Sequence, residues 1–200
     1  MIKTTRMLNE ELRNYTNTGA AISRMVAKGS LIPVRHGLYE TDRNVPGHCL
    51  ALPIYGPSYL SFEYALSYYG LIPEGTTRHT NATFRKHRTK EFNTPFGFFS
   101  YRDIPDKAYP WHIHLLSENG YPFQIAAPEK AVCDKLYTVS PFRNRHDLEQ
   151  WLFEDMRFDP GVFFHLDMQK LQQTAALYRT TNHRILISFI RKELRHAADH

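Results

Sequence analysis

The pattern of apolar and polar residues changes from helical to strand-like spacing within the first forty residues. Thr5–Arg13 is predicted to form a short helix. A second helix begins at Asn17 or Thr18, both of which suit an N-cap, and runs to about Lys28. Gly29 follows at the position where a helix end commonly requires a positive φ. The apolar residues of this second helix share one face: Ile22, Met25 and Val26.

Two short extended segments follow the second helix. Leu31–Val34 and Leu38–Glu40 are separated by Arg35, His36 and Gly37, a compact turn in which glycine makes a positive φ inexpensive. We therefore predict a β-hairpin with a basic tip.

The segment that comes next, Asp42–Pro57, is rich in proline and glycine and is predicted to be a linker. This places the domain boundary after the hairpin. Residues 1–45 would form one domain and residues 55–200 a second.

The remainder of the chain mixes helical and strand patterns. Ser61–Tyr69 is expected to be a helix that ends at Gly70, and Pro128 suits the first position of a helix reaching Tyr137. Three strands are expected, of which the first two could pair across a basic loop: Thr80–Phe84, Phe96–Tyr101 and Phe123–Ala126. Three further helices form the C-terminal part: Asn144–Asp155, Asp167–Arg179 and Asn182–His196. The predicted class is α+β, with an N-terminal winged helix-turn-helix followed by a mixed α/β domain with a helical C-terminal part.

A helix with small outward residues, followed by a basic hairpin, is the plan of a winged helix that binds double-stranded DNA. The helix enters the major groove, and the basic residues meet phosphates. The candidate DNA-binding residues in this part of the chain are Ser23, Arg24 and Lys28 on the helix, Arg35 and His36 at the hairpin tip, and Arg43 beyond it. The alternative is a small module that contacts other proteins.

A second basic segment lies at Thr77–Lys90, which contains no acidic residue, in a chain of formal net charge +5. The charge favours anionic partners. Arg85, Lys86 and Arg88 are candidates for sequence-independent contacts with DNA phosphates. The alternative is a solvated loop between two strands.

Enzymatic function is not expected, because no phosphate-binding loop, dinucleotide fingerprint, nucleophile elbow or zinc-protease motif is present. Cys133 is predicted to be a buried small apolar residue rather than a nucleophile. His112 and His114 are two residues apart on a predicted strand, but no third ligand follows at a suitable spacing, so no metal or cofactor is expected.

The compartment follows from what the sequence lacks. There are two cysteines, Cys49 and Cys133, no apolar segment resembling a signal peptide, and no apolar run long enough to span a bilayer. We expect a cytoplasmic protein without membrane contact.

Four stretches in register resemble the AbiEi family, the antitoxins of type IV toxin–antitoxin systems. The resemblance covers about residues 9–137, and its most specific parts are a K-G-x-L-x-x-V-R-x-G-x-Y hairpin and an A-x-P-E-K-A-x-x-D helix. The stretches are ISRMVAKGSLIPVRHGLYE, YLSFEYALSYYGLIPE, FGFFSYRDIP and IAAPEKAVCDKLY. The chain ahead of the second helix is short for the family, Ala127 stands where members often have Ser or Thr, and nothing after Tyr137 matches.

The resemblance implies a transcriptional autoregulator that represses its own operon by binding its operator, and an antitoxin whose neighbouring gene encodes a nucleotidyltransferase-like toxin. Such regulators commonly bind two-fold operators, which is consistent with a homodimer, although no heptad seam is visible. Two alternatives remain open: a winged-helix module that binds protein or RNA with no toxin partner, and an enzyme acting on nucleic acid without a known motif.

Overall fold

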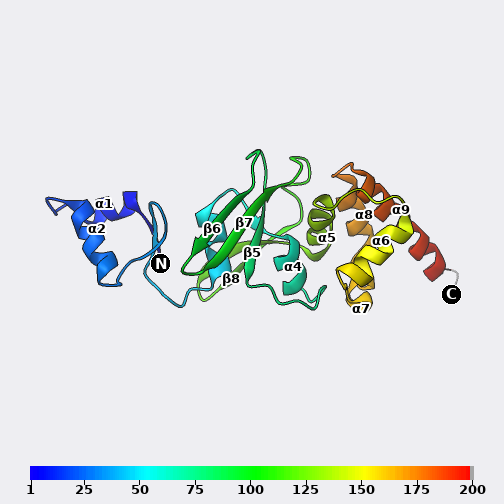
Figure 1. Cartoon of the computed structure of the whole chain (residues 1–200), viewed down its shortest axis with the longest axis horizontal. Coiled ribbons are helices and arrows are strands. Elements are labelled where there is room, and N and C mark those ends of the chain that lie inside the picture. Colours follow the sequence, from blue (N-terminus) through cyan, green and yellow to red (C-terminus); the bar gives the residue numbers. More distant parts are fainter. Residues whose placement is uncertain (199–200) are drawn as a thin grey trace.

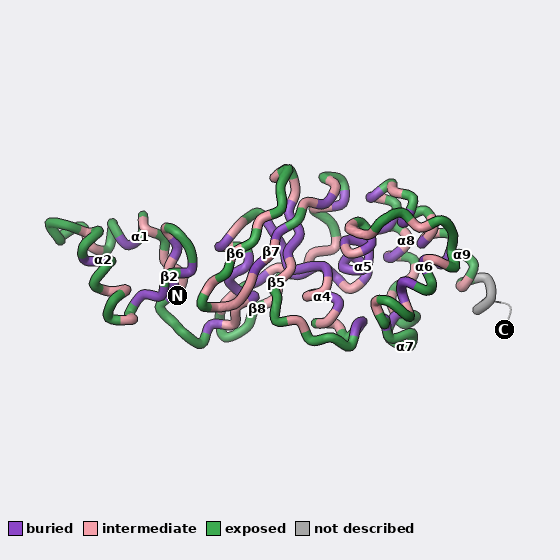
Figure 2. Tube along the Cα trace, viewed as in Figure 1, coloured by how far each residue is buried: buried purple, intermediate pink, exposed green. Residues whose placement is uncertain are grey.

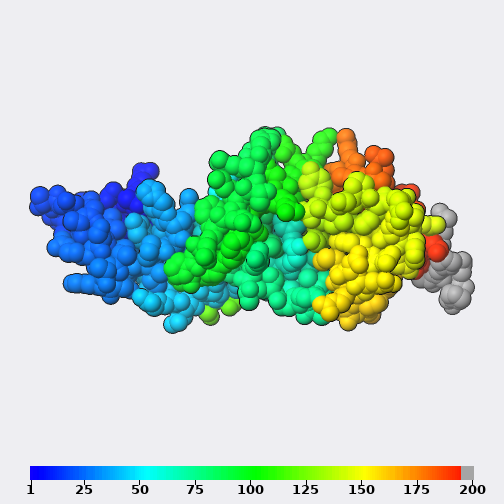
Figure 3. Space-filling model, viewed as in Figure 1, coloured from blue at the N-terminus to red at the C-terminus, as the bar shows by residue number. Residues whose placement is uncertain are grey.

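The computed structural model describes the backbone of residues 1–198 and the side chains of residues 1–194. Figure 1 shows an elongated molecule with a small N-terminal unit at one end, a β-sheet in the middle and a group of helices at the other end. The space-filling view in Figure 3 shows the N-terminal unit protruding from the body of the molecule. The predicted α+β class is confirmed, since helices and two sheets occur together.

The N-terminal unit has its own small core. Helices α1 (Thr5–Glu11) and α2 (Thr18–Ala27) pack beside a sheet of order β1-β3-β2, made of β1 (Ile2–Thr4), β2 (Ile32–Arg35) and β3 (Leu38–Glu40). As predicted, Asn17 caps α2, and its side chain accepts a hydrogen bond from the Ala20 amide at 2.9 Å. The core residues are Leu8, Ile22 and Leu31. Strand β1 was not predicted, because three residues are too few to show the alternating pattern of a strand.

The segment predicted to be a linker, Asp42–Pro57, is largely part of the second core. It forms a 3₁₀ turn η1 (Gly47–Leu50) and helix α3 (Ala51–Ile54), and Cys49, Leu50 and Ile54 are buried. The prediction of a linker is therefore wrong over residues 47–54. Glycine serves here as a tight-packing residue rather than as a flexible one.

Gly47 shows why this segment needs glycine. A Cβ atom there would overlap the carbonyl oxygen of Phe96 and the ring of His79. We expect Gly47→Ala to lower the free energy of unfolding by about 1–3 kcal/mol, because a backbone carbonyl cannot move aside cheaply. Gly75→Ala is the matched control, since nothing lies within 4 Å of its added Cβ. Urea unfolding of both variants tests this, and equal midpoints would contradict it.

The central sheet has six strands in the order β6-β7-β5-β4-β9-β8. The strands are β4 (Tyr59–Leu60), β5 (Arg78–Thr83), β6 (Lys90–Thr94), β7 (Gly97–Asp103), β8 (Ile113–Glu118) and β9 (Tyr121–Ala126). The two strands predicted to pair across the basic loop do pair, but in parallel, with Arg78 opposite Phe98. Strand β6 forms the antiparallel hairpin with β7 instead. It lies partly inside the basic segment, where charge concealed its alternation.

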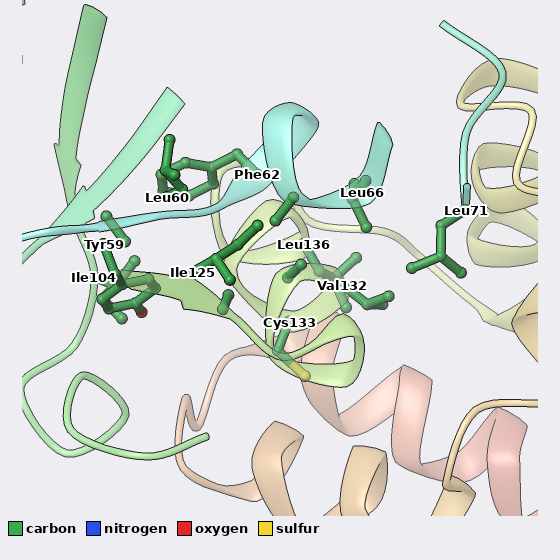
Figure 4. Close-up of a cluster of buried hydrophobic side chains, with 14 of the residues drawn as sticks. Tyr59, Leu60, Phe62, Leu66, Leu71, Ile104, Ile125, Val132, Cys133 and Leu136 are labelled. Carbon is green, nitrogen blue, oxygen red and sulfur yellow. The ribbon is translucent and has the colours of Figure 1, made fainter. Parts of the chain in front are cut away.

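Helices α4 (Phe62–Tyr68) and α5 (Pro128–Tyr137) link the sheet to the C-terminal helices. Figure 4 shows Leu66 of α4, Val132 and Leu136 of α5 and Ile125 of β9 converging in one apolar cluster. Figure 2 shows the same concentration of buried residues between the sheet and α5. Helix α5 occupies the predicted bounds, and Pro128 stands at its start.

A buried polar cluster fastens α5 to its neighbours. The Asp134 carboxylate accepts hydrogen bonds from Tyr59 Oη at 2.9 Å, Ser61 Oγ at 2.6 Å, Lys130 Nζ at 3.0 Å and Tyr178 Oη. Lys130 and Asp134 are both 0% exposed. Burial, with the Asp134 charge second, raises the pKa of Tyr59 and of Tyr178 well above the ordinary value, so both remain donors. The cluster joins β4, α5 and the chain after α8.

The C-terminal part is helical, as predicted. It comprises α6 (Arg145–Gln150), which continues as a π-helical turn η2 (Trp151–Asp155), then α7 (Pro160–Phe164), α8 (Met168–Ala176) and α9 (Thr181–Ala198). Helix α7 was not predicted, because five residues are too few to show a helical period.

His183 of α9 is held as a neutral imidazole. Its Nε2 lies 3.0 Å from the Cys133 carbonyl oxygen, to which it donates, and its Nδ1 lies 2.7 Å from the Thr180 hydroxyl. Burial lowers its pKa from 6.5 to about 4, against the opposing effect of the Cys133 carbonyl. Protonation would require Nδ1 to become a donor and would place a charge in the core.

Because the pKa of His183 is lower in the folded chain than in the unfolded chain, the free energy of unfolding falls as the pH is lowered. The unfolded chain binds the proton below about pH 6.5 and the folded chain only near pH 4, so stability is complete above pH 6.5 and is lost as the pH falls toward 4. Between pH 7 and pH 5 the loss from His183 should be about 2 kcal/mol. His183→Gln, which does not titrate, should flatten the pH profile measured by urea unfolding. An unchanged profile would contradict this assignment.

Candidate nucleic-acid interface

The outer face of α2 carries the first group of predicted site residues. Ser23, Arg24 and Lys28 are exposed, on the side of the helix away from the buried Ile22. Figure 2 shows exposed stretches of α2 at the free end of the molecule. A shallow hollow of about 260 Å³ lies beside this face. It is lined by Leu12, Tyr15, Ala21, Arg24, Met25 and Lys28.

Arg43 joins this face although it comes after the hairpin. Its guanidinium lies against Gly29, where an added Cβ would be 3.2 Å from Nη2. Gly29 has a φ of +73°, so it ends α2 with the left-handed residue that the sequence predicted. The end of α2 thus brings Arg43 close to the last helical turn, where Lys28 is the C-cap.

The hairpin residues are placed differently. Arg35 and His36 are both exposed, and Gly37 has the positive φ, +76°, that the tight turn requires. However, β2 contacts β6 of the central sheet. Burial raises the pKa of Tyr101, and the nearby Arg35 charge opposes that rise, so Arg35 lies close to the second unit. The structure therefore groups Arg24, Lys28 and Arg43, and places Arg35 toward the body of the molecule.

The cations of the N-terminal face are not neutralised internally. Among the described residues, no carboxylate lies within 4 Å of Arg24, Lys28, Arg35 or Arg43, whereas Lys3 is paired with Glu11 at 2.5 Å. Unpaired cations on an exposed helix are available to an anionic partner.

The basic segment Thr77–Lys90 is less free than its sequence indicates. Arg85 Nε lies 2.5 Å from an Asp106 oxygen, and Asp103 accepts hydrogen bonds from the amides of Lys86 at 2.7 Å and His87 at 2.6 Å. The fold thus brings acids from the end of β7 and from just beyond it to a segment that has none in sequence.

The side chains of Lys86 and Arg88 complete this loop. Lys86 Nζ donates to the Gly56 carbonyl at 3.0 Å and lies 5.0 Å from the centre of the Tyr55 ring. Arg88 is exposed, with no carboxylate within 4 Å in the described part of the chain. Of the three predicted phosphate contacts, Arg88 is therefore the least engaged by the protein itself.

The two histidines weighed as a metal pair have separate partners. His112 Nδ1 is 2.7 Å from the Thr174 hydroxyl, and His114 Nδ1 is 3.3 Å from the Tyr69 hydroxyl. Within the described residues, no group of three or more His, Cys, Asp or Glu side chains could hold a metal ion.

Cys133 is fully buried in α5, as predicted, and burial raises the pKa of its thiol. A buried thiol that resists ionisation is a poor nucleophile. The Lys130–Asp134 pair beside it is equally inaccessible, so no substrate reaches either group.

The contact between the N-terminal unit and the central sheet was not predicted. Tyr121 Oη of β9 donates to Glu40 Oε1 at 3.0 Å, and the amides of Thr41 and Asp42 donate to the same oxygen at 2.8 and 3.0 Å. Glu40 is fully buried. An acid at the end of a predicted hairpin strand gave no signal that a distant tyrosine would cover it.

Searches of protein-family models and of curated proteins both find no match to this chain. Among solved structures, the crystal structure of the RV2827C protein from Mycobacterium tuberculosis is similar over 94% of this chain and 76% of that chain, at 14% sequence identity and a TM-score of 0.46. None of the helices described has both the length and the apolar character needed to cross a bilayer.

Proposed function

We propose that the chain is a cytoplasmic DNA-binding regulator whose residues 1–45 form a winged helix, with α2 as the helix that reads the major groove. The observation that carries this proposal is the exposed group Arg24, Lys28 and Arg43 on and beside α2, with no carboxylate within 4 Å among the described residues. The body of the chain, residues 55–200 together with the packed segment before it, would serve the other functions of the protein.

The geometry of this face suits a DNA duplex. The exposed side chains beside the cations on α2 are small, Ser23 and Ala27, so the helix axis could approach the base edges closely. Arg24 and Lys28 are four residues apart and therefore lie on one side of the helix. Long cationic side chains on one side of a helix can reach phosphates along the edge of a groove.

The antitoxin role rests on the resemblance of four motifs to the AbiEi family. On that basis, we propose that the target is the protein's own operator and that a neighbouring gene encodes a nucleotidyltransferase-like toxin. A homodimer on a two-fold operator belongs to the same proposal.

The test is a mobility-shift titration of the full chain with the DNA upstream of its own gene, alongside unrelated DNA of equal length. We expect a complex that persists under excess unrelated DNA. Equal affinity for the two DNAs would contradict operator recognition, and no complex with either would contradict DNA binding.

A second function, binding of another protein, is favoured by one observation. Tyr15 beside α2 is 55% exposed, and it lines the hollow together with Leu12 and Met25. A hollow lined partly by apolar residues, with an exposed aromatic residue beside it, is typical of protein contacts. In that case the titration gives no shift with either DNA.

The basic loop provides a further prediction within this function. Replacing Arg85, Lys86 and Arg88 together by alanine should weaken binding to all DNA sequences equally, because phosphates carry no sequence information. Most of the loss should come from Arg88, since Asp106 already neutralises Arg85. The single variants Arg88→Ala and Arg85→Ala measure the contribution of each arginine to DNA affinity, which is determined at several salt concentrations. Unchanged affinity in the triple variant would show that the segment is only a solvated loop.

A further inference from the structure

A cavity of about 330 Å³ opens on the central sheet, away from the proposed DNA-binding face. Its walls come from β5, β6 and β7, from the start of α4 and from Thr138 just after α5. This volume is at the lower end of the range of small-molecule sites, about 300–1,000 Å³. The residues on which the argument depends are Glu63, Arg78, Thr80, Glu91, Ser100 and Arg102.

The register of strands β5, β6 and β7 places the polar side chains of this cavity in a row along one face of the sheet. Ser100 of β7 is opposite Glu91 of β6 and Thr80 of β5. Arg102 is two residues beyond Ser100, and Arg78 is two residues before Thr80, so all five lie on one face of the sheet. At about 3.3 Å per residue, the α-carbons of the two arginines are about 13 Å apart along the strands. One cation thus stands at each end, with hydroxyl and carboxylate groups between them.

Both arginines are available to a ligand. Among the described residues, neither guanidinium has a carboxylate within 4 Å. The Arg78 guanidinium lies 4.7 Å from the centre of the Phe98 ring, which holds it in place without using its charge. Glu63 is already paired with Lys135 at 2.5 Å, so Glu91 is the one lining acid in the described structure without a cation within 4 Å.

One further feature marks this cavity. Phe62 in its wall has a φ of +52°, a strained backbone conformation for a bulky residue, and such conformations cluster at ligand-binding sites.

We propose that this cavity binds a small molecule with an anionic group at each end and hydroxyl groups between them, of the chemical class of a sugar bisphosphate. Arg78 and Arg102 bind the two anionic groups, because guanidinium forms its strongest hydrogen bonds with phosphate and carboxylate oxygens. Glu91 and Ser100 accept hydrogen bonds from the central hydroxyls. A nucleic-acid backbone fits less well, because Glu63 and Glu91 would face its phosphates.

The test is calorimetric titration of the full chain with fructose 1,6-bisphosphate and, separately, with fructose 6-phosphate. We expect the bisphosphate to bind at least about 10-fold more tightly, since the monophosphate forgoes one charge-assisted contact. Arg78→Ala and Arg102→Ala should each weaken the bisphosphate by about 10-fold or more and remove its advantage over the monophosphate. Arg145→Ala, which removes an exposed cation elsewhere, should change neither affinity.

A variant that loses only the preference for the bisphosphate over the monophosphate has lost ligand recognition, whereas a misfolded variant would lose binding of both sugars. Arg102 is exposed, and Arg102→Lys keeps the charge, so this variant should retain most of the preference for the bisphosphate. Absence of bisphosphate binding by the unmodified chain would overturn the proposal. So would equal binding of the two sugars, or an effect of the arginine variants on DNA binding alone, which would make the cavity part of the nucleic-acid surface. The two calorimetric outcomes do not depend on whether α2 binds an operator.

Discussion

Asp134→Ala is expected to be the most destabilising single substitution in the described chain, with a loss of about 3–5 kcal/mol in the free energy of unfolding. The reason is the number of donors that the carboxylate satisfies. Tyr59, Ser61, Lys130 and Tyr178 all converge on it in a region that water does not reach. Its removal leaves the buried Lys130 ammonium without a counter-charge and three buried hydroxyls without their acceptor, and each such group costs free energy.

Lys130→Met should cost less than Asp134→Ala, because methionine fills most of the lysine volume and Asp134 keeps its three hydroxyl donors. Asp155→Asn is the surface control, since Asp155 is exposed and has no ion-pair partner in the described chain. Urea unfolding followed by circular dichroism ranks the three. A smaller loss for Asp134→Ala than for Lys130→Met would show that the ion pair, rather than the hydroxyl network, dominates this cluster.

The same cluster shows where prediction from sequence succeeds and where it stops. The bounds of α5 follow from Pro128 and a helical apolar period, and the structure confirms both. Nothing local to Lys130 or Asp134 announces that they are buried, because i and i+4 charges of opposite sign are also typical of solvated helix faces. Their partners come from β4, from Ser61 just after it and from the chain after α8, so the burial is a property of the tertiary fold.

The central sheet illustrates the same limit in topology. The apolar patterns of β5 and β7 identified both strands, but pattern does not encode the sense of pairing. That sense depends on β6, whose residues Lys90 and Glu91 give it the composition of a loop. The failed linker prediction has a similar cause, since Gly47 is required by the close approach of Phe96, 49 residues further along the chain.

The candidate nucleic-acid interface also has a part that the sequence predicts and a part that depends on the tertiary fold. Exposure of Ser23, Arg24 and Lys28 follows from helical periodicity, because the apolar positions of α2 fix its outward face. The position of Arg43 beside Gly29 and the pairing of Arg85 with Asp106 depend on chain segments meeting in space. Local periodicity therefore predicts which face of one helix is exposed. A site that is built from several chain segments can be recognised only once the tertiary fold is known.

The double variant Arg24→Ala, Lys28→Ala should reduce affinity for the DNA upstream of the gene by at least about 10-fold at moderate salt, while leaving the fold intact. If both residues contact phosphates, the slope of log affinity against log salt falls by about one unit for each. If one of them reads a base, that contact costs about 1–3 kcal/mol and discrimination at one operator position is lost. The salt slope therefore distinguishes the two roles, and their exposure predicts an unchanged unfolding midpoint.

The matched control is Arg145→Ala, Lys192→Ala, which removes the same charge from exposed positions on α6 and α9, at the opposite end of the molecule from α2 (Figure 1). It should leave both affinity and slope unchanged, because a screened charge acts over about 10 Å at 0.1 M salt. Equal weakening by the two double variants would mean that net charge alone drives binding. Full affinity in the α2 variant would exclude this helix as the reader and leave the exposed hollow beside Tyr15 as a protein-binding surface, since the same helix face could not then be in contact with DNA.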